Sequence, residues 1–312
     1  MILVDGIRRQ YGKTIAVDNL SFELKRGEIY AFVGPNGAGK STTMRILGTL
    51  EEPDSGTASI DGLSLIEHPE YARRHIGYMP DSLPSHYDIT VHDYIDFFAR
   101  VYGIRSPDRE RRVDSIEEFC NLTGIREKQI RALSKGMKQR VSLARALIHD
   151  PKFLLMDEPA AGLDPRARIE LRELIRVLAD QGKTILISSH ILSELSEICN
   201  SALIIEQGRL LRHGTLDEIV QQSASGHNVR MQTLKIRSME PQAQLLEFLS
   251  GLPNVDETRP IGNWVEVDLE MDDRIASELL RLLVGNFSIV EFHAKQAGLE
   301  EVFMNVTEGM VQ

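Results

Sequence analysis

Short apolar segments that end in polar residues recur along the N-terminal part of the chain. Glu28–Val33, Lys152–Met156 and Thr184–Ser188 are β-prone, and none alternates between apolar and polar positions. That pattern is typical of strands buried on both faces of a parallel sheet. Between the last two segments, an amphipathic pattern over Arg166–Gln181 predicts a helix. Alternating strands and helices therefore indicate an α/β core.

Two further regions depart from this alternation. From Asp81 to about Gly124 the pattern is helical, most clearly at Val91–Tyr102, and it predicts a helical lobe at about residues 81–150 inserted into the core. The polar segment Gln221–Gly226 has the composition of a linker. We therefore expect a first domain at residues 1–220, a linker at 221–226 and a second domain at 227–312.

The second domain is expected to be a small α+β unit. Its predicted elements are Val229–Ile236, Pro241–Leu249, Val255–Arg259, Asn263–Leu269, Asp273–Leu283, Ser288–Phe292 and Leu299–Val306. With Val255–Arg259 as a strand, their order approaches the βαββαβ order of a ferredoxin-like domain.

Composition narrows the class of protein. The formal net charge of −10 argues against broad binding to nucleic acid. No segment reaches the about 18–20 uninterrupted apolar residues of a membrane span, and Asp5 interrupts any signal peptide. Cys120 and Cys199 form no zinc-site or disulfide pattern. We expect a protein of the reducing cytoplasm.

The residues after the first predicted strand form a phosphate-binding motif, G-x-x-x-x-G-K-[ST]. It lies between a strand and a predicted helix, where backbone N–H groups and the helix N-terminus attract an anion. Lys40 would reach the β- and γ-phosphates of ATP, and the Ser41 hydroxyl would hold Mg²⁺. The residues expected to contact the nucleotide here are Gly34, Pro35, Asn36, Gly37, Ala38, Gly39, Lys40, Ser41 and Thr42.

Polar side chains follow the other two core strands. Asp157 and Glu158 come after Lys152–Met156, and His190 follows Thr184–Ser188. The carboxyl ends of parallel strands are where ligands bind in sheets of this type. Asp157 is a predicted magnesium ligand, and Glu158 is the predicted general base or water-orienting residue.

Together with four further segments, these motifs resemble the nucleotide-binding subunit of an ATP-binding cassette (ABC) transporter. Leu133–Arg140 resembles the family's signature loop, Ala160–Pro165 resembles the loop after the second nucleotide motif, and His190 matches its switch histidine. Tyr11 lies where the family has an adenine-stacking aromatic residue. The resemblance covers roughly residues 1–220 and implies a P-loop NTPase fold.

The resemblance also implies a composite site. Ser134 can cap the following helix, whose N-terminus, with Gly136, would contact ATP held by a second subunit. The partner would be a second copy or a similar ATPase subunit, in a head-to-tail dimer with two ATP molecules between the subunits. His190 would contact the γ-phosphate.

Two positions depart from the family pattern. Lys135 and Met137 replace a glycine and a glutamine of the usual signature, and Lys135 adds a cation near the partner's triphosphate. Asp81 stands where the family has a glutamine that contacts Mg²⁺ and links to the membrane subunit. Its carboxylate is charged but shorter and cannot donate a hydrogen bond, so both a metal-ligating role and its absence stay open.

The sequence therefore predicts an ATPase that powers a separate membrane permease, peripheral to the cytoplasmic face of the inner or plasma membrane. The signature, the single cassette and the tail near Gly298–Phe303 resemble ABC-2-type export systems. One alternative is a soluble ABC ATPase acting on ribosomes or DNA, and another is a non-hydrolysing regulatory subunit. The single cassette disfavours the former, and the presence of Lys40, Asp157 and Glu158 disfavours the latter.

Overall fold

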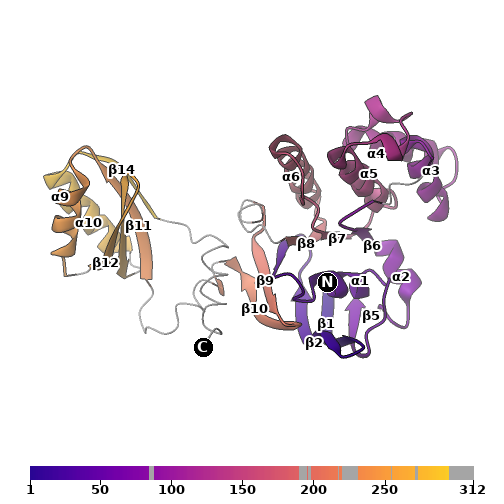
Figure 1. Ribbon diagram of the computed structural model, residues 1–312, viewed down its shortest axis with the longest axis horizontal. Helices are drawn as coiled ribbons and strands as arrows, with labels where there is room; N and C mark the ends of the chain where they lie inside the picture. Colours follow the sequence, from indigo (N-terminus) through magenta and orange to yellow (C-terminus); the bar gives the residue numbers. More distant parts are fainter. Residues whose placement is uncertain are drawn as a thin grey trace. The chain divides into compact units, whose positions relative to one another are not determined.

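The chain divides into two compact units, Met1–Leu216 and Asp217–Gln312 (Figure 1). The computed structural model describes residues 1–83, 88–189, 195, 198–216, 218–219, 231–253, 255–270 and 273–294. His190, the predicted linker 221–226 and the predicted segment Leu299–Val306 lie outside the described residues.

A six-stranded sheet forms the centre of the first unit, in the order β10-β9-β3-β8-β7-β6. All its pairs are parallel except β9 with β10. The strands are β3 (Ile29–Val33), β6 (Ile76–Met79), β7 (Phe153–Asp157), β8 (Thr184–Ser189), β9 (Ser201–Glu206) and β10 (Arg209–Thr215). Every residue of β3, β7 and β8 is buried, which explains why these segments do not alternate.

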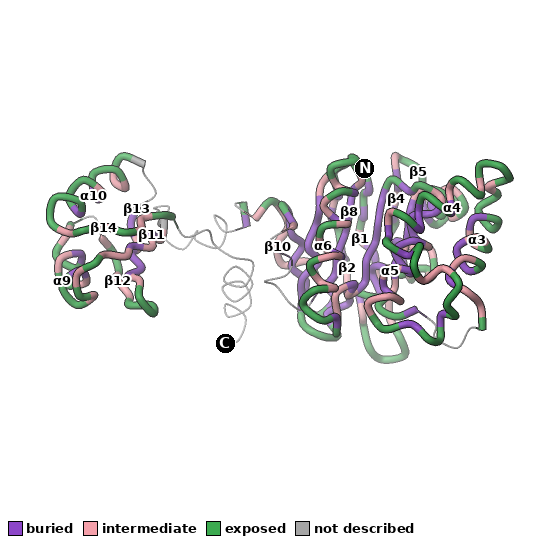
Figure 2. The backbone as a smooth tube through the Cα atoms, turned by 90° about the horizontal axis from the view of Figure 1, so that it is seen from above, coloured by how far each residue is buried: buried purple, intermediate pink, exposed green. Residues whose placement is uncertain are grey.

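A second sheet in this unit is antiparallel and has the order β2-β1-β4-β5. Its strands are β1 (Ile2–Tyr11), β2 (Thr14–Leu24), β4 (Ser55–Ile60) and β5 (Leu63–Ser64). Apolar side chains of β1, β2 and β4 share one core with side chains of β3 and helix α1 (Lys40–Leu47). Figure 2 shows the buried residues concentrated along these strands. This core fixes the segment between β3 and α1 on both sides.

The inserted lobe is helical. It contains α3 (Val91–Val101), α4 (Asp108–Phe119), the short 3₁₀ segments η1 (Thr123–Ile125) and η2 (Ile130–Ala132), and α5 (Lys135–Leu147). Two helices outside the lobe, α2 (Pro69–His75) and α6 (Pro165–Asp180), precede β6 and β8. Asp164 caps α6 by accepting a hydrogen bond from the Ala167 N–H, and Pro165 occupies its first turn.

The second unit is a four-stranded antiparallel sheet with two helices. Its elements are β11 (Met231–Ser238), α9 (Gln242–Ser250), β12 (Val255–Ile261), β13 (Trp264–Glu270), α10 (Asp273–Asn286) and β14 (Ile289–Ala294). The strand order is β12-β13-β11-β14. Leu245 and Leu249 of α9 and Leu279 and Leu283 of α10 pack against buried side chains of β11 and β13. The element order is thus β-α-β-β-α-β.

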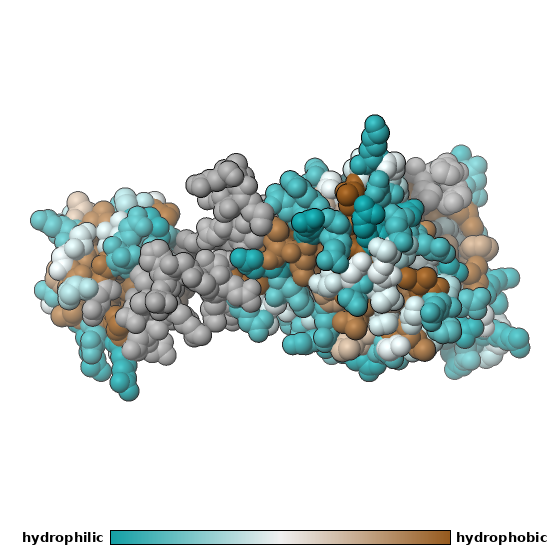
Figure 3. All heavy atoms as spheres, turned by 90° about the horizontal axis from the view of Figure 1, so that it is seen from below, coloured by the Kyte–Doolittle hydropathy of each residue, from teal (hydrophilic) through white to brown (hydrophobic). Residues whose placement is uncertain are grey.

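The described surface carries both polar and apolar side chains. On the face drawn in Figure 3, hydrophilic side chains protrude over much of the described surface. Within the described residues, no helix combines the length and the apolar character needed to cross a bilayer.

Candidate functional site

The predicted phosphate-binding loop connects β3 to α1, between a buried strand and a helix N-terminus. Gly39 has a φ of +102°, and a Cβ there would lie 2.3 Å from the Ala16 carbonyl oxygen. A Cβ on Gly34 would lie 2.4 Å from the Ile205 carbonyl oxygen. Only glycine fits at these two positions, because the loop is held against the backbones of β2 and β9. The loop is therefore a tightly enclosed turn whose shape depends on both sheets.

Lys40, the first residue of α1, lies inside this loop. Its side chain is 7% exposed, and Nζ donates to the carbonyl oxygens of Gly34 at 2.6 Å and Pro35 at 3.2 Å. Burial lowers the pKa of the Lys40 ammonium, and the negative charges of Glu158 and Asp157 oppose that shift. A cation thus lies within the loop, in the electrostatic field of both predicted carboxylates.

The two carboxylate residues lie at the end of β7 and share one hydroxyl. Ser188 Oγ, from the neighbouring strand β8, donates to Asp157 Oδ1 at 2.7 Å. The same oxygen accepts the backbone N–H of Glu158 at 2.9 Å. Asp157 and Ser188 are direct neighbours in the β7–β8 register, and both are buried. Ser188 is therefore part of the site.

Ser188 was not predicted from the sequence as a site residue. The available signal was a hydroxyl residue at the end of the strand predicted to lie in the same sheet as Asp157. Glu158 adds a second feature, because its φ of +48° places a non-glycine residue in the left-handed region. Backbone strain of this kind concentrates at functional sites.

Asp81 lies beyond the end of β6, the strand next to β7. Burial and the negative charges of Asp157 and Asp81 raise the pKa of Tyr78, on β6, to about 12. Among the described residues no hydrogen bond or ion pair engages the exposed Asp81 carboxylate, whereas its backbone carbonyl accepts Gln139 Nε2 at 2.9 Å. Gln139 is buried in α5, so the segment after β6 is bound to the helical lobe.

The described residues contain no group of three or more His, Cys, Asp or Glu side chains that could hold a metal ion. Ser41, within the loop, nevertheless supplies a hydroxyl, and Asp157, whose charge acts on Lys40, supplies a buried carboxylate. This donor set fits Mg²⁺, which is commonly bound by one or two protein side chains together with substrate phosphates.

The signature residues lie in the helical lobe. Ser134 Oγ accepts the Met137 N–H at 3.3 Å and caps α5, as expected. Gly136 is half-buried, and a Cβ there would lie 3.3 Å from Ala167 Cβ. In the described part of the chain, no hydrogen bond or ion pair joins Ser134 or Gly136 to the phosphate-binding loop. The structure therefore brings Lys40, Asp157 and Glu158 together but not the signature residues.

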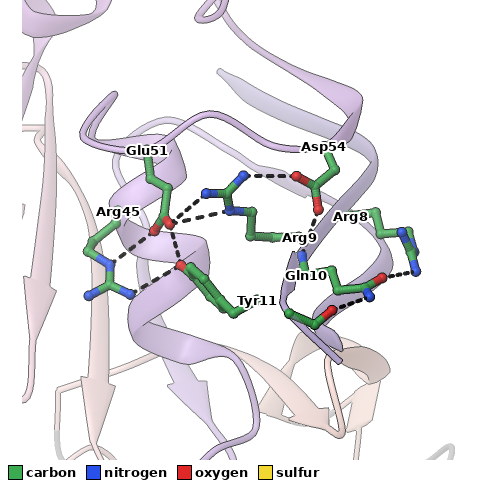
Figure 4. Close-up of polar contacts among 8 residues, drawn as sticks. Arg8, Arg9, Gln10, Tyr11, Arg45, Glu51 and Asp54 are labelled. Atoms are coloured by element: carbon green, nitrogen blue, oxygen red, sulfur yellow. Dashed lines mark hydrogen bonds and ion pairs between the residues drawn. The ribbon is translucent and has the colours of Figure 1, made fainter. Parts of the chain in front are cut away.

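Tyr11 lies at the end of β1 and is 39% exposed. Its hydroxyl donates to Glu51, in the segment that follows α1 (Figure 4). Arg9 and Arg45 contact the same carboxylate, so the aromatic ring belongs to a charged cluster (Figure 4). Tyr11 was predicted from the sequence as a site residue, but these neighbours were not.

Sequence comparisons agree with this geometry. The profile of the family described as "ABC transporter" matches residues 17–161. A protein named Nod factor export ATP-binding protein I, from Ralstonia nicotianae, is 38% identical over 220 residues, which is 70% of this chain and 68% of the relative. The protein of the same name from Cupriavidus pinatubonensis is 34% identical over 303 residues, 96% of this chain and 89% of the relative. The linearmycin resistance ATP-binding protein LnrL of Bacillus subtilis is 27% identical and covers 98% of both chains.

Solved structures match a part of the chain about as long as the first unit. An ATP-binding subunit of an ABC transporter superposes with a TM-score of 0.65 at 34% identity, covering 71% of this chain and 92% of the other. A dimeric ATP-binding cassette in a post-hydrolysis state, bound to ADP and phosphate, superposes with a TM-score of 0.63 at 23% identity, covering 69% and 98%. The second match supports the fold alone. These matches confirm the predicted P-loop cassette.

Proposed function

The chain belongs to the ABC transporter family as an ATP-binding subunit, and from that premise we propose how its residues use ATP to drive a separately encoded permease. The protein binds and hydrolyses ATP to power transport. The relatives named for Nod factor export and linearmycin resistance support export as its direction. The observation that most supports an ATPase site is the buried Lys40 within its glycine-lined loop, in the electrostatic field of Asp157 and Glu158.

The proposed roles follow from where the groups lie. The loop 34–42 holds the triphosphate, with Lys40 exchanging its two backbone carbonyl partners for phosphate oxygens. Ser41 and Asp157 hold Mg²⁺, which when bound neutralises charge on the phosphates. Glu158 accepts a proton from, or orients, the attacking water. Ser188 keeps Asp157 and Glu158 at fixed positions through its two hydrogen bonds.

The second half of the site comes from another ATPase subunit. Ser134 and Gly136 begin α5 on a lobe that has no hydrogen bond to the chain's own phosphate loop among the described residues. A capped helix N-terminus that carries no acidic residue in its first turn is suited to an anion from elsewhere. We assign that anion to the γ-phosphate held by the partner subunit. His190, outside the described residues, is proposed to contact the γ-phosphate.

Movement reaches the permease through the helical lobe. The Gln139–Asp81 hydrogen bond and a second one from Arg145 Nη2 to the Tyr78 carbonyl at 2.9 Å tie α5 to the β6 end of the core. When hydrolysis moves the residues at the ends of β6 and β7, these hydrogen bonds therefore transmit the movement to α5. We propose that the chain acts peripherally, on the cytoplasmic side of a membrane that holds the permease.

Steady-state ATPase measurements on the purified full-length protein test this proposal, with and without membranes containing its permease. We expect phosphate release that depends on Mg²⁺ and whose rate changes when the membranes are present. Absence of hydrolysis under both conditions would contradict the proposed catalytic roles.

A further inference from the structure

Glu51 is held between two arginines and the Tyr11 hydroxyl, at the point where β1 ends and the chain leaves α1 (Figure 4). From this cluster we infer that Glu51 is a positioning residue for the nucleotide base. It acts by fixing the Tyr11 ring in the orientation that stacks on adenine. The inference rests on the stacking role of Tyr11, which the family resemblance implies, and it adds a residue to which no role has been assigned.

The phenol is held from two sides. Tyr11 Oη donates to Glu51 Oε1, and Arg45 Nη2 donates to Tyr11 Oη at 3.4 Å. Arg45 also pairs with Glu51, its Nε lying 3.3 Å from Oε2. The Glu51 side chain is only 16% exposed, so its charge is screened less than that of a fully exposed carboxylate. A change of the Tyr11 χ1 rotamer would move Oη and break the contacts to both residues.

One face of the ring is already covered. The Arg9 guanidinium carbon lies 5.1 Å from the centroid of the Tyr11 ring. Arg9 is itself fixed, because Nη2 lies 3.2 Å from Glu51 Oε1 and Nη1 lies 2.8 Å from Asp54 Oδ1. The guanidinium therefore acts as a cationic backing on one face of the ring. Since 39% of Tyr11 stays accessible, the ring still has surface to offer to a second planar group such as a nucleobase.

The ring is also close to the phosphate-binding loop. Tyr11 pairs with Thr14 at the β1–β2 turn, and the carbonyl of Ala16, two residues on, is the group that excludes a side chain at Gly39. On the other side, Arg45 follows Ser41 by four residues on α1, which is about 6 Å of helix. Base and triphosphate of one nucleotide can therefore contact Tyr11 and the loop together.

Removal of the Glu51 carboxylate has two consequences. Arg9 and Arg45 lose the charge that they share, and the phenol loses its acceptor. The Tyr11 side chain then samples other rotamers. Nucleotide binding must therefore restrict it, and the loss of conformational entropy weakens binding, whereas Glu51 restricts the side chain before the nucleotide binds. Only interactions with the base should weaken, because no described contact joins Glu51 to the phosphate loop.

Isothermal titration of the full-length protein with MgATP and with magnesium tripolyphosphate separates base from phosphate binding. We expect Glu51→Ala to weaken MgATP binding by about tenfold, and Tyr11→Ala by at least as much, since stacking on an aromatic ring contributes on that scale. Tripolyphosphate binding should stay within about twofold for both, which also shows that the variants fold. Glu51→Gln, which keeps the volume, should give an intermediate loss. Glu52→Ala is the matched control, because this neighbouring carboxylate is exposed and should leave both affinities unchanged.

A double variant decides whether Glu51 acts through Tyr11. In the Tyr11→Ala background, Glu51→Ala should cause no further loss of MgATP affinity, whereas independent effects would add. Full additivity, or an equal loss of tripolyphosphate binding, would overturn the positioning role while stacking by Tyr11 stands. An unchanged MgATP affinity in Tyr11→Ala itself would instead reject stacking, and with it the positioning role.

Discussion

The Ser188 hydroxyl lies 2.7 Å from Asp157 Oδ1 and donates to it. With its lone pairs it accepts the backbone N–H of Glu158, so one buried side chain on β8 fixes two consecutive residues at the end of β7. The positions of the predicted magnesium ligand and the predicted base are thus coupled.

Removal of this hydroxyl should slow the chemical step. Ser188→Ala removes the hydroxyl's hydrogen bonds with Asp157 Oδ1 and the Glu158 N–H. A hydrogen bond to a charged group is worth about 1.5–3 kcal/mol. We expect kcat for ATP to fall about tenfold or more, with KM within about twofold, in steady-state phosphate-release assays. Ser142→Ala is the control, because it removes an equally buried hydroxyl that has no hydrogen-bond partner among the described residues. A fall in kcat of the same size in both variants would remove Ser188 from the site.

Asp81 should matter for coupling more than for nucleotide binding. Its exposed carboxylate stands where the family has a residue that links to the membrane subunit. Its backbone carbonyl, which accepts from Gln139, is retained in Asp81→Ala, so any loss reports on the side chain. We expect this variant to keep its ATP affinity and to lose ATP-driven export, measured in membranes that contain the permease. Gln139→Leu, which removes the hydrogen bond itself, should reproduce the loss. Unchanged export in Asp81→Ala would exclude its side chain from the coupling path.

The requirement for glycine in the phosphate-binding loop can be tested by adding a single Cβ atom at Gly39. Gly39→Ala places Cβ 2.3 Å from the Ala16 carbonyl oxygen, so β2 and the loop must separate. We expect ATP affinity to fall at least about tenfold, as one displaced loop N–H or Lys40 contact would suffice. At Gly27, also with a positive φ of +76°, a Cβ meets nothing within 4 Å. Gly27→Ala should therefore cost only the backbone strain of about 1–2 kcal/mol in a urea unfolding experiment, with ATP affinity unchanged.

Acid should destabilise the protein through His149. Its ring stacks on Tyr102 with centroids 3.9 Å apart, and Nε2 donates to the Ile76 carbonyl at 3.1 Å. Burial lowers the pKa of His149 to about 4, from about 6.5 in an unfolded chain. Because the folded pKa is the lower one, this contribution is complete above about pH 6.5 and is lost progressively as the pH falls toward about 4.

The size of this effect is about 2 kcal/mol, allowing for the part of the ring that water reaches. Urea unfolding at pH 8 and pH 4.5 should show that His149→Phe, which keeps a stacking ring, loses less stability on acidification than the unsubstituted protein. His68→Phe, at an exposed histidine, is the matched control and should retain the full loss. Equal losses in the protein and in His149→Phe would contradict the assignment.

Most of the correct predictions from the sequence came from the polar residues that end apolar segments and from helical periodicity. The apolar segments Glu28–Val33 and Thr184–Ser188 became β3 and β8 with ends shifted by one residue at most. The antiparallel sheet of the first unit, β2-β1-β4-β5, was not predicted. The pairing of β1 with β2 shifts register between Val4 and Ile7 and again before Arg9, so apolar positions do not recur at a constant interval of two.

Contacts between distant segments were the other omission. Ser188 meets Asp157 only because β7 and β8 pair in one particular register, which no local pattern contains. Glu51 meets Tyr11 across 40 residues of sequence. In both cases the motif residue, Asp157 or Tyr11, was predicted from the sequence. Its hydrogen-bond partner, Ser188 or Glu51, was found only in the structure.

The central claim is that Glu158 completes an ATPase site at the end of β7. It is tested most directly by Glu158→Gln in the purified full-length protein, with phosphate release and molar mass measured in the same MgATP solution. We expect hydrolysis to fall at least about a hundredfold while ATP stays bound and the molar mass doubles as two subunits close on the nucleotide. Normal turnover by Glu158→Gln would contradict it.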